Sequence, residues 1–392
     1  MRRPSPYPLP QGEGERGMKR TVIAHFVTGG GTGATRVALD LALAQSAEHE
    51  LHLILRNKGR PLSPVMQEQI RQAGLALHWV DNVWPRFRVI GQLSALCGEI
   101  KPQVFFAHGY SEHLWGRRAA FAANVPTVIH VEHNVERYLP WRVWAARRLA
   151  GRTAATACVS QAVADNVRRL GIGSARVEVL HNGVDLKRYS CDRPLRERSG
   201  DILMPARFAR KKDQPTLIRA AKLLVERGWQ GQLLLAGGGK PVHRRKCERL
   251  VQQLGLGQRV QFLGNVNDLP QRLGQCRVAA LATWQEGLPL VLAEAMAAGC
   301  AVVASGIPGV TDILKNGANG WTFPAGDEKA AADALWQALT DDVEAQRSAD
   351  AGRADAKGHF SLDSMARRYE DLLRELLADS TPPLPLPQGE GE

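Results

Sequence analysis

The chain has 392 residues, of which 44% are hydrophobic and 23% are charged, and its formal net charge at pH 7 is +12. This composition is typical of a folded globular protein and excludes collagen-like, low-complexity and disulfide-scaffold chains, while the length favours two domains. Six scattered cysteines without a Cys-x-x-Cys pair fit reduced thiols better than a zinc site. No apolar run reaches the ~18 residues of a membrane-spanning helix, so we expect a cytoplasmic protein.

The basic residues are concentrated in one half of the chain. Residues 18–190 carry 22 lysines and arginines against 12 aspartates and glutamates, whereas residues 191–392 carry 26 against 25. A basic half favours an anionic partner, namely a phospholipid surface, a phosphorylated acceptor or nucleic acid. A solvated surface that binds nothing is the alternative.

Both ends of the chain carry the same eight residues, PLPQGEGE, at 8–15 and at 385–392. Nothing in this repeat can form a hydrophobic core. We therefore expect disordered tails over residues 1–17 and 379–392, with Met18 as the natural start just before the first strand.

Residues 18–190 alternate between short β-branched runs and helical patterns. This alternation predicts a parallel, doubly wound sheet, with helices such as 35–45 and 161–170 between the strands. The expected strands are 21–27, 50–56, 75–80, 103–107, 127–131, 155–159 and 176–180.

The same alternation returns after a polar stretch and predicts a second domain over residues 191–360. Helices are expected at 216–227 and 242–254, and an amphipathic helix within 361–378 is expected to pack back on the first domain. The fold class is α/β, with two Rossmann-like doubly wound domains that face each other across a cleft. The expected strands of the second domain are 201–205, 232–235, 259–263, 277–282 and 301–304.

A glycine-rich loop follows the first strand. Gly29, Gly30 and Gly31 would let the backbone approach a phosphate at a helix N-terminus, and the run fits the GxGxxA form of the dinucleotide fingerprint. NAD binding also requires a carboxylate at the end of the second strand, where this chain has Arg56. An NADP site therefore stays open, as does a purely structural turn.

Three further loops follow strands of the second domain, and they carry the residues typical of an anion site. Residues 207–212 hold four cations, residues 237–239 are glycines, and residues 284–296 hold Glu286 and Glu294 around a turn at Gly287. Free backbone N–H groups at the start of the following helix favour an anion, whereas the two carboxylates suit sugar hydroxyls.

The spacing Glu286-x7-Glu294 resembles the E-x7-E signature of retaining GT-B glycosyltransferases of family 4, the glycosyl transferases group 1. Other elements of that family follow in the same order over residues 21–378. They are Asn182-Gly183-Val184-Asp185, the pair Arg207 and Lys212, the run Gly237–Gly239, Phe262-Leu263-Gly264, Ser305–Gly309 and Asn319-Gly320.

The resemblance implies a role for each matching residue. The expected catalytic residues are Arg207 and Lys212 on the diphosphate, Glu286 on the transferred sugar, and His133 on the sugar or the acceptor. Asp213 and Gly238 depart from the family pattern, where glycine and an acidic residue are usual. The expected donor-binding residues are Gly30, Gly31, Gly238, Val266 near the base, the backbone of Gly287, Leu288 and Pro289, and Glu294 on the ribose.

The implied function is transfer of a sugar, with retention, from a nucleotide-diphosphate sugar to a hydroxyl of a glycan or lipid-linked acceptor in cell-surface polysaccharide or lipopolysaccharide synthesis. A UDP-sugar is favoured over a GDP-sugar. We expect no cofactor, and no metal because no DxD-like motif ends a strand. The alternatives are an NADP-dependent oxidoreductase, a nucleotide-sugar epimerase and, without catalysis, a nucleic-acid binding protein; we expect no nucleic-acid partner because interleaved aromatics are lacking.

Two clusters of tryptophan and arginine lie in the basic half. Trp141, Trp144 and Arg148 share a face at helical spacing, and residues 114–118 form the second cluster. Tryptophan with arginine suits an anionic membrane surface, so we expect peripheral docking on the inner leaflet. Tryptophans packed in the core are the alternative.

Overall fold

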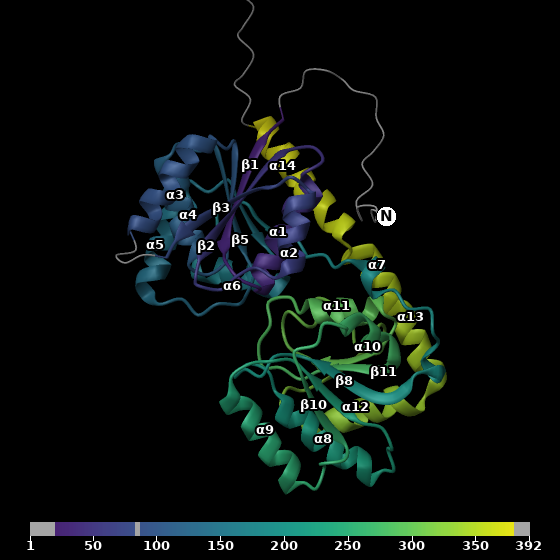
Figure 1. The fold of residues 1–392 in the computed structure, drawn as a ribbon. Coiled ribbons are helices and arrows are strands. Elements are labelled where there is room, and N and C mark those ends of the chain that lie inside the picture. The colour runs from purple at the N-terminus through teal and green to yellow at the C-terminus, as the bar shows by residue number, and fades with distance from the viewer. Residues whose placement is uncertain (1–19, 83–86, 380–392) are drawn as a thin grey trace, which may run out of the picture.

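The computed structural model describes residues 20–82 and 87–379. The expected start at Met18 and the tails at 1–17 and 380–392 lie outside the described residues. Residue 379, expected in a tail, ends the last helix. Two domains, each built on one parallel sheet, lie one above the other (Figure 1).

The first domain is a seven-stranded sheet in the order β3-β2-β1-β4-β5-β6-β7, with every pair parallel. Its strands are β1 (Val22–Thr28), β2 (Glu50–Asn57), β3 (Ala76–Asp81), β4 (Val104–His108), β5 (Thr127–Glu132), β6 (Ala155–Cys158) and β7 (Val177–Val179). Its helices are α1 (Gly33–Gln45), α2 (Pro64–Gln72), α3 (Phe87–Ile100), α4 (Glu112–Ala122), α5 (Pro140–Ala150) and α6 (Gln161–Leu170).

The second domain is a six-stranded parallel sheet in the order β10-β9-β8-β11-β12-β13. Its strands are β8 (Ser199–Pro205), β9 (Leu233–Ala236), β10 (Val260–Gly264), β11 (Cys276–Leu281), β12 (Ala301–Ser305) and β13 (Trp321–Phe323). The helices after β7 are α7 (Leu186–Tyr189), the 3₁₀ turn η1 (Leu195–Glu197), α8 (Gln214–Glu226), α9 (Pro241–Gln253), α10 (Leu269–Gln275), α11 (Leu290–Ala297), α12 (Glu328–Thr340), α13 (Asp342–His359) and α14 (Leu362–Asp379).

Both faces of the first sheet are covered, which explains why β1 is buried from Ile23 to Val27 and apolar there except for His25. Ile23 and Val27 belong to the core under α1 and α14, whereas Ala24 and Phe26 belong to the core under α3 and α4. Side chains two residues apart therefore share a face. The same alternation determines which histidine side chains on neighbouring strands lie on one face of the sheet.

Helix α14 leaves the second domain and packs on the first. It lies beside α1 in Figure 1, and Met365, Tyr369 and Leu373 enter the core formed by α1 and the sheet. The backbone of Val184 pairs with that of Ser361 in an isolated parallel bridge. There the segment that enters the second domain runs beside the segment that leaves it. The domains are thus joined by two neighbouring segments.

The expected strands and helices are present, with ends shifted by a few residues. Several elements were not among the sequence expectations, including the long helices α12 and α13. The others include β13, α7 and η1, each only three or four residues long. Such short segments carry too few residues to show a period. Pro289 is the N-cap residue of α11.

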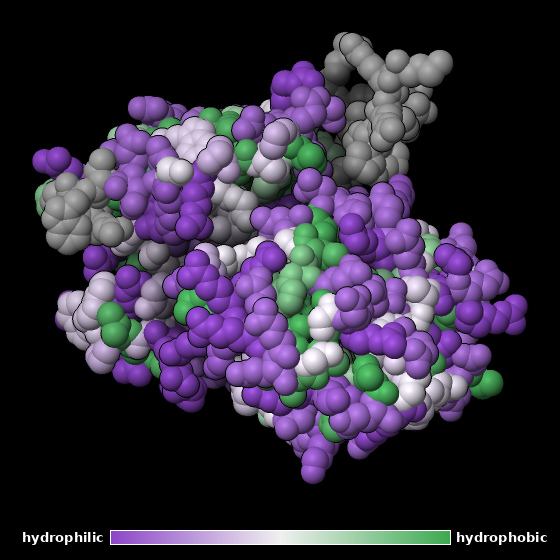
Figure 2. Space-filling model, turned by 60° about the horizontal axis from the view of Figure 1, so that its bottom comes forward, coloured by the Kyte–Doolittle hydropathy of each residue, from purple (hydrophilic) through white to green (hydrophobic). Residues whose placement is uncertain are grey.

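No helix among the described residues is both long and apolar enough to cross a bilayer. Figure 2 shows a face on which hydrophilic residues dominate and hydrophobic ones form smaller patches.

Candidate active site between the domains

The carboxyl ends of both sheets face a pair of adjoining cavities of about 700 and 610 Å³. Glu136, Arg210, Lys211 and Gln285 line both. The larger cavity is also lined by Arg60, Asn134, Arg207, Phe208, Ala209, Lys212, Gly239, Lys240, His243 and Glu286. The smaller one is also lined by Tyr110, Val135, Arg137, Trp284.

The loop after β8 brings the expected diphosphate ligands to the larger cavity. Arg207 is exposed, and its guanidinium makes no hydrogen bond or ion pair to another described residue. Lys212 is half-buried, and its ammonium pairs with the Glu286 carboxylate. Thr283 donates to the same carboxylate oxygen at 2.7 Å. Three of the four expected catalytic residues are thus brought together.

The glycines at 237–239 are explained by contact with the protein's own backbone. Gly237 and Gly239 have φ values of 154° and 140°, and a Cβ on Gly239 would lie 2.3 Å from the Phe208 carbonyl oxygen. Phe208 donates to Gly238 O at 2.6 Å. This contact orients the loop of Arg207. Val266, expected near the base, is half-buried in the loop after β10.

The turn before α11 touches the other domain. A Cβ on Gly287 would lie 2.0 Å from the carbonyl oxygen of His133, so only glycine allows this approach. Gly287, Leu288 and Pro289 are buried, and among the described residues no acceptor is present for the N–H groups of Gly287 and Leu288. Unpaired N–H groups at a helix start favour an anion.

Glu294 lies apart from the cavity residues. Its carboxylate is hydrogen-bonded to Tyr189 of α7, and burial raises its pKa. Neither large cavity is lined by Glu294 or by Gly30, Gly31 and His133.

Arg60 links the glycine-rich loop to the site, because its Cβ lies only 2.9 Å from the position that a Cβ on Gly30 would take. Gly31 faces open space. Sequence reasoning missed Arg60, Glu136 and Lys240 as lining residues. Each follows the carboxyl end of a strand, and that position was the available signal.

The Arg56 side chain is already engaged elsewhere. It is buried, forms an ion pair with Glu112 at 2.5 Å, and lies over the Trp115 ring at 4.5 Å. A cation held in this way is not available to a 2′-phosphate. The expectation of an NADP site therefore loses its one specific ligand.

His133 directly follows β5 and is buried, with 7% of its surface exposed. Burial lowers the pKa of its imidazole to about 4. Glu136, three residues later, lines both cavities. Its pKa is raised, mainly by burial and to a lesser extent by the nearby Glu132 carboxylate.

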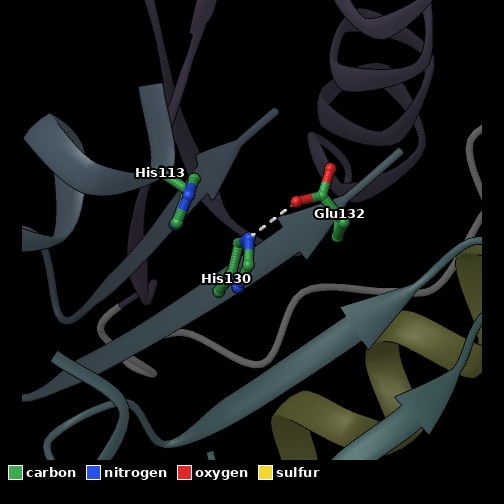
Figure 3. A group of neighbouring side chains, drawn as sticks. All are labelled: His113, His130 and Glu132. Atoms are coloured by element: carbon green, nitrogen blue, oxygen red, sulfur yellow. Dashed lines mark ion pairs between the residues drawn. The ribbon is translucent and has the colours of Figure 1, made fainter. Parts of the chain in front are cut away.

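A second polar group lies on the other face of β5. His113 and His130 stack face to face with ring centroids 4.2 Å apart, and His130 lies 3.6 Å from Glu132 (Figure 3). A metal ion bonds each imidazole along its in-plane lone pair, so two stacked rings do not converge on one ion. The buried guanidinium of Arg117 also bonds His113 Nδ1 at 2.9 Å. The group is a buried polar network.

The two clusters of tryptophan and arginine differ in the structure. Trp141 and Trp144 on α5 are 59% and 54% exposed, and Arg148 lies over the Trp144 ring at 3.9 Å. The expectation for residues 114–118 is wrong, because Arg117 is fully buried and Trp115 packs on the core. Their positions on α4 face the sheet.

Two family models together match most of the chain. "Glycosyltransferase Family 4" matches residues 31–188 and "Glycosyl transferases group 1" matches residues 189–355, with the boundary in the linker that joins the two sheets. This chain is a family 4 glycosyltransferase. The cavities between its sheets are therefore those of a glycosyltransferase with the GT-B fold.

Similar proteins include two bacterial glycosyltransferases. UDP-Gal:alpha-D-GlcNAc-diphosphoundecaprenol alpha-1,3-galactosyltransferase of Escherichia coli is 23% identical over 80% of this chain and 86% of its own. GalNAc-alpha-(1->4)-GalNAc-alpha-(1->3)-diNAcBac-PP-undecaprenol alpha-1,4-N-acetyl-D-galactosaminyltransferase of Campylobacter jejuni is 25% identical over 79% and 86%. Among solved structures, Anabaena Alr3699/HepE in complex with UDP and glucose has a TM-score of 0.80 at 19% identity, covering 91% of this chain and 100% of that one.

Proposed function

We propose that this glycosyltransferase moves a sugar, with retention of its anomeric configuration, from a UDP-sugar to a hydroxyl of a lipid-linked glycan. The observation that carries the proposal is the larger cavity, where Arg207, Lys212 and Glu286 meet residues of the other domain. UDP bound to HepE and the diphosphoundecaprenol acceptor of the E. coli relative support the choice of donor and acceptor.

The donor diphosphate would lie on Arg207 and Lys212, next to the free N–H groups of Gly287 and Leu288. These groups stabilise the negative charge that grows on the leaving phosphate as the C1–O bond breaks. The acceptor oxygen forms the new bond to C1 on the same face, and its proton passes to the departing phosphate oxygen. Such a route requires neither a separate base nor a metal.

The charge of the two cavities exceeds what a donor needs. They are lined by seven lysines and arginines against two glutamates, and a nucleotide diphosphate carries about two negative charges. The excess favours an acceptor that carries phosphate as well. The seven cations are Arg60, Arg137, Arg207, Arg210, Lys211, Lys212 and Lys240.

We further propose that α5 brings the enzyme to an anionic leaflet in the cytoplasm. Leu139, Trp141 and Trp144 are exposed at its start, and Arg148 supplies a cation beside them. Helix α5 begins a few residues after Asn134 and Glu136, which line the larger cavity. Docking through this helix would hold the cavity near the membrane, where a lipid-linked acceptor lies.

The test is an assay with UDP-sugars and GDP-sugars, using an undecaprenyl-diphosphate sugar as acceptor. We expect UDP release that depends on the acceptor, an unchanged rate in EDTA, and a product whose anomeric proton coupling by NMR matches that of the donor. Conversion of the donor without acceptor would instead identify an epimerase. An inverted product would contradict retention, and turnover of NADPH would identify an oxidoreductase.

A further inference from the structure

Three buried histidines form a continuous hydrogen-bonded row that ends at His133. His133 Nε2 lies 3.1 Å from His108 Nδ1, and His108 Nε2 lies 3.1 Å from His25 Nδ1. His25 Nε2 then lies 3.0 Å from Oε1 of the Gln45 side chain. Gln45 is the last residue of α1. His25, His108 and Gln45 are at most 1% exposed.

Strand register explains why these histidines meet. His25 on β1 pairs with Phe106 on β4, and His108 is two residues further along. His108 pairs with Val131 on β5, and His133 is again two residues further along. A step of two keeps each ring on the same face of the sheet and moves it toward the carboxyl edge. The row therefore runs from α1 to the interdomain contact.

Burial keeps these three rings neutral at physiological pH. It lowers the pKa of His25 to about 3 and that of His133 to about 4, and it lowers that of His108 well below its usual value. A neutral imidazole has one N–H and one lone pair, so each ring in the row donates at one end and accepts at the other. All rings must then point the same way.

The side-chain amide of Gln45 sets that direction, because its Oε1 faces His25 Nε2 and accepts from an N–H there. With the amide in this orientation, Gln45 Nε2 has no partner among the described residues. His108 then donates from Nε2 to His25, and His133 donates from Nε2 to His108. Nδ1 of His133 has no hydrogen bond to a described residue and is not among the buried unpaired atoms, so it stays accessible. Its lone pair is what the ring offers to a ligand.

We propose that Gln45, His25 and His108 are positioning residues that hold His133 in the Nε2–H tautomer, so that Nδ1 accepts a hydrogen bond from a sugar or acceptor hydroxyl. The first part concerns the protein alone, and the contact with a hydroxyl rests on the proposed function. Gln45 acts on His133 through two intervening rings. None of the four residues of the row, His133 included, lines the two cavities; His133 instead lies at the contact with Gly287 of the other domain.

Two variants distinguish an effect on the direction of the hydrogen bonds in the row from an effect on the packing of its side chains. In Gln45→Met the His25 Nε2–H would have no acceptor, and in His25→Phe the same holds for the His108 Nε2–H. A buried N–H without a partner costs more than an unpaired lone pair, so the row should reverse in both variants. Phe at position 25 keeps the stack on Phe106, where the centroids are 4.5 Å apart. His78→Phe is the matched control, because it breaks another pair, His52 Nδ1 to His78 Nε2 at 3.0 Å, outside the row.

The measurement is long-range ¹H–¹⁵N NMR of histidine-labelled full-length protein near pH 8, with the His133 signals assigned by their loss in His133→Asn. We expect the proton on Nε2 in the unmodified protein and in His78→Phe, and on Nδ1 in Gln45→Met and His25→Phe. A proton on Nδ1 in the unmodified protein, or an unchanged tautomer in both folded variants, would overturn the proposal.

Kinetics test the contact with substrate separately. Reversal should lower kcat/KM by about ten- to a hundredfold, as expected for one lost hydrogen bond that leaves its partner unpaired, with the control unchanged. A reversed tautomer with unchanged kcat/KM would overturn the contact with a hydroxyl. Failure of the proposed function would show as no sugar transfer by the unmodified protein, while the tautomer measurement needs no substrate.

Discussion

Arg207 and Lys212 are on one loop but differ in what they contact. Within the described part of the chain the Arg207 guanidinium has no partner to give up when a diphosphate binds, whereas Lys212 is already paired with Glu286. We predict that Arg207→Ala lowers kcat by ~10²–10³ with an unchanged melting temperature, because it removes one preorganised charge. Arg245→Ala, an exposed arginine on α9 outside both cavities, is the control. Near-normal turnover of Arg207→Ala would contradict the diphosphate role.

Lys212→Ala should differ from Arg207→Ala in stability as well as rate. It leaves the half-buried Glu286 carboxylate with Thr283 alone as a partner among the described residues. An uncompensated carboxylate of this kind destabilises the fold. We therefore expect Lys212→Ala to lose turnover and also to have a lower melting temperature, measured by differential scanning calorimetry. Equal melting temperatures for the two variants would contradict the observed ion pair.

At the scale of one element, α5 combines two exposed tryptophans with Arg148, whose guanidinium lies over the Trp144 ring. Arg147, by contrast, donates a hydrogen bond to Leu170 O at 2.8 Å. We predict binding to vesicles of phosphatidylglycerol and phosphatidylcholine at low salt, with little binding to phosphatidylcholine alone. Arg148→Glu should weaken it by at least about fivefold, since each cation near an anionic surface contributes ~1 kcal/mol. Co-sedimentation gives the bound fraction.

The matched control for this charge reversal is Arg196→Glu, an exposed arginine of the other domain. Trp141→Ala with Trp144→Ala should also reduce binding, because the indoles insert at the interface. Binding that is insensitive to salt, or equally weakened by the control, would contradict docking through α5.

At the scale of the whole molecule, the buried histidines make one domain sensitive to acid. Burial lowers the pKa of each, so the unfolded chain binds more protons and stability falls as the pH falls below ~6.5. Each such group contributes up to ~1.4 kcal/mol per pH unit to the slope, opposed by the raised pKa of buried Glu132. The five are His25, His108, His113, His130 and His133.

The described part of the second domain contains no buried histidine. We therefore predict that hydrogen exchange by mass spectrometry at pH 5.5 shows early opening of residues 20–180, while residues 199–340 stay protected. Protection equal in both domains at pH 7.5 and pH 5.5, after correction for intrinsic exchange, would contradict this account.

The sequence by itself determined the two parallel sheets and the loops that follow their strands. Each of these rests on a local period or on spacing over a few residues, such as Glu286-x7-Glu294, and such patterns are readable along the chain. The expected strands therefore agree with the structure to within a few residues, and the family 4 resemblance is confirmed by the matching models.

Only the tertiary structure decided which of these residues meet. His25 and His108 are 83 residues apart and become neighbours because β4 lies next to β1. Arg56 is occupied by Glu112, and Arg117 faces the sheet inside the protein. Strand order and side-chain direction create these contacts, and neither quantity is encoded in spacing along one chain. The loops around the cavity were thus predictable, whereas the partners of their charged side chains were not.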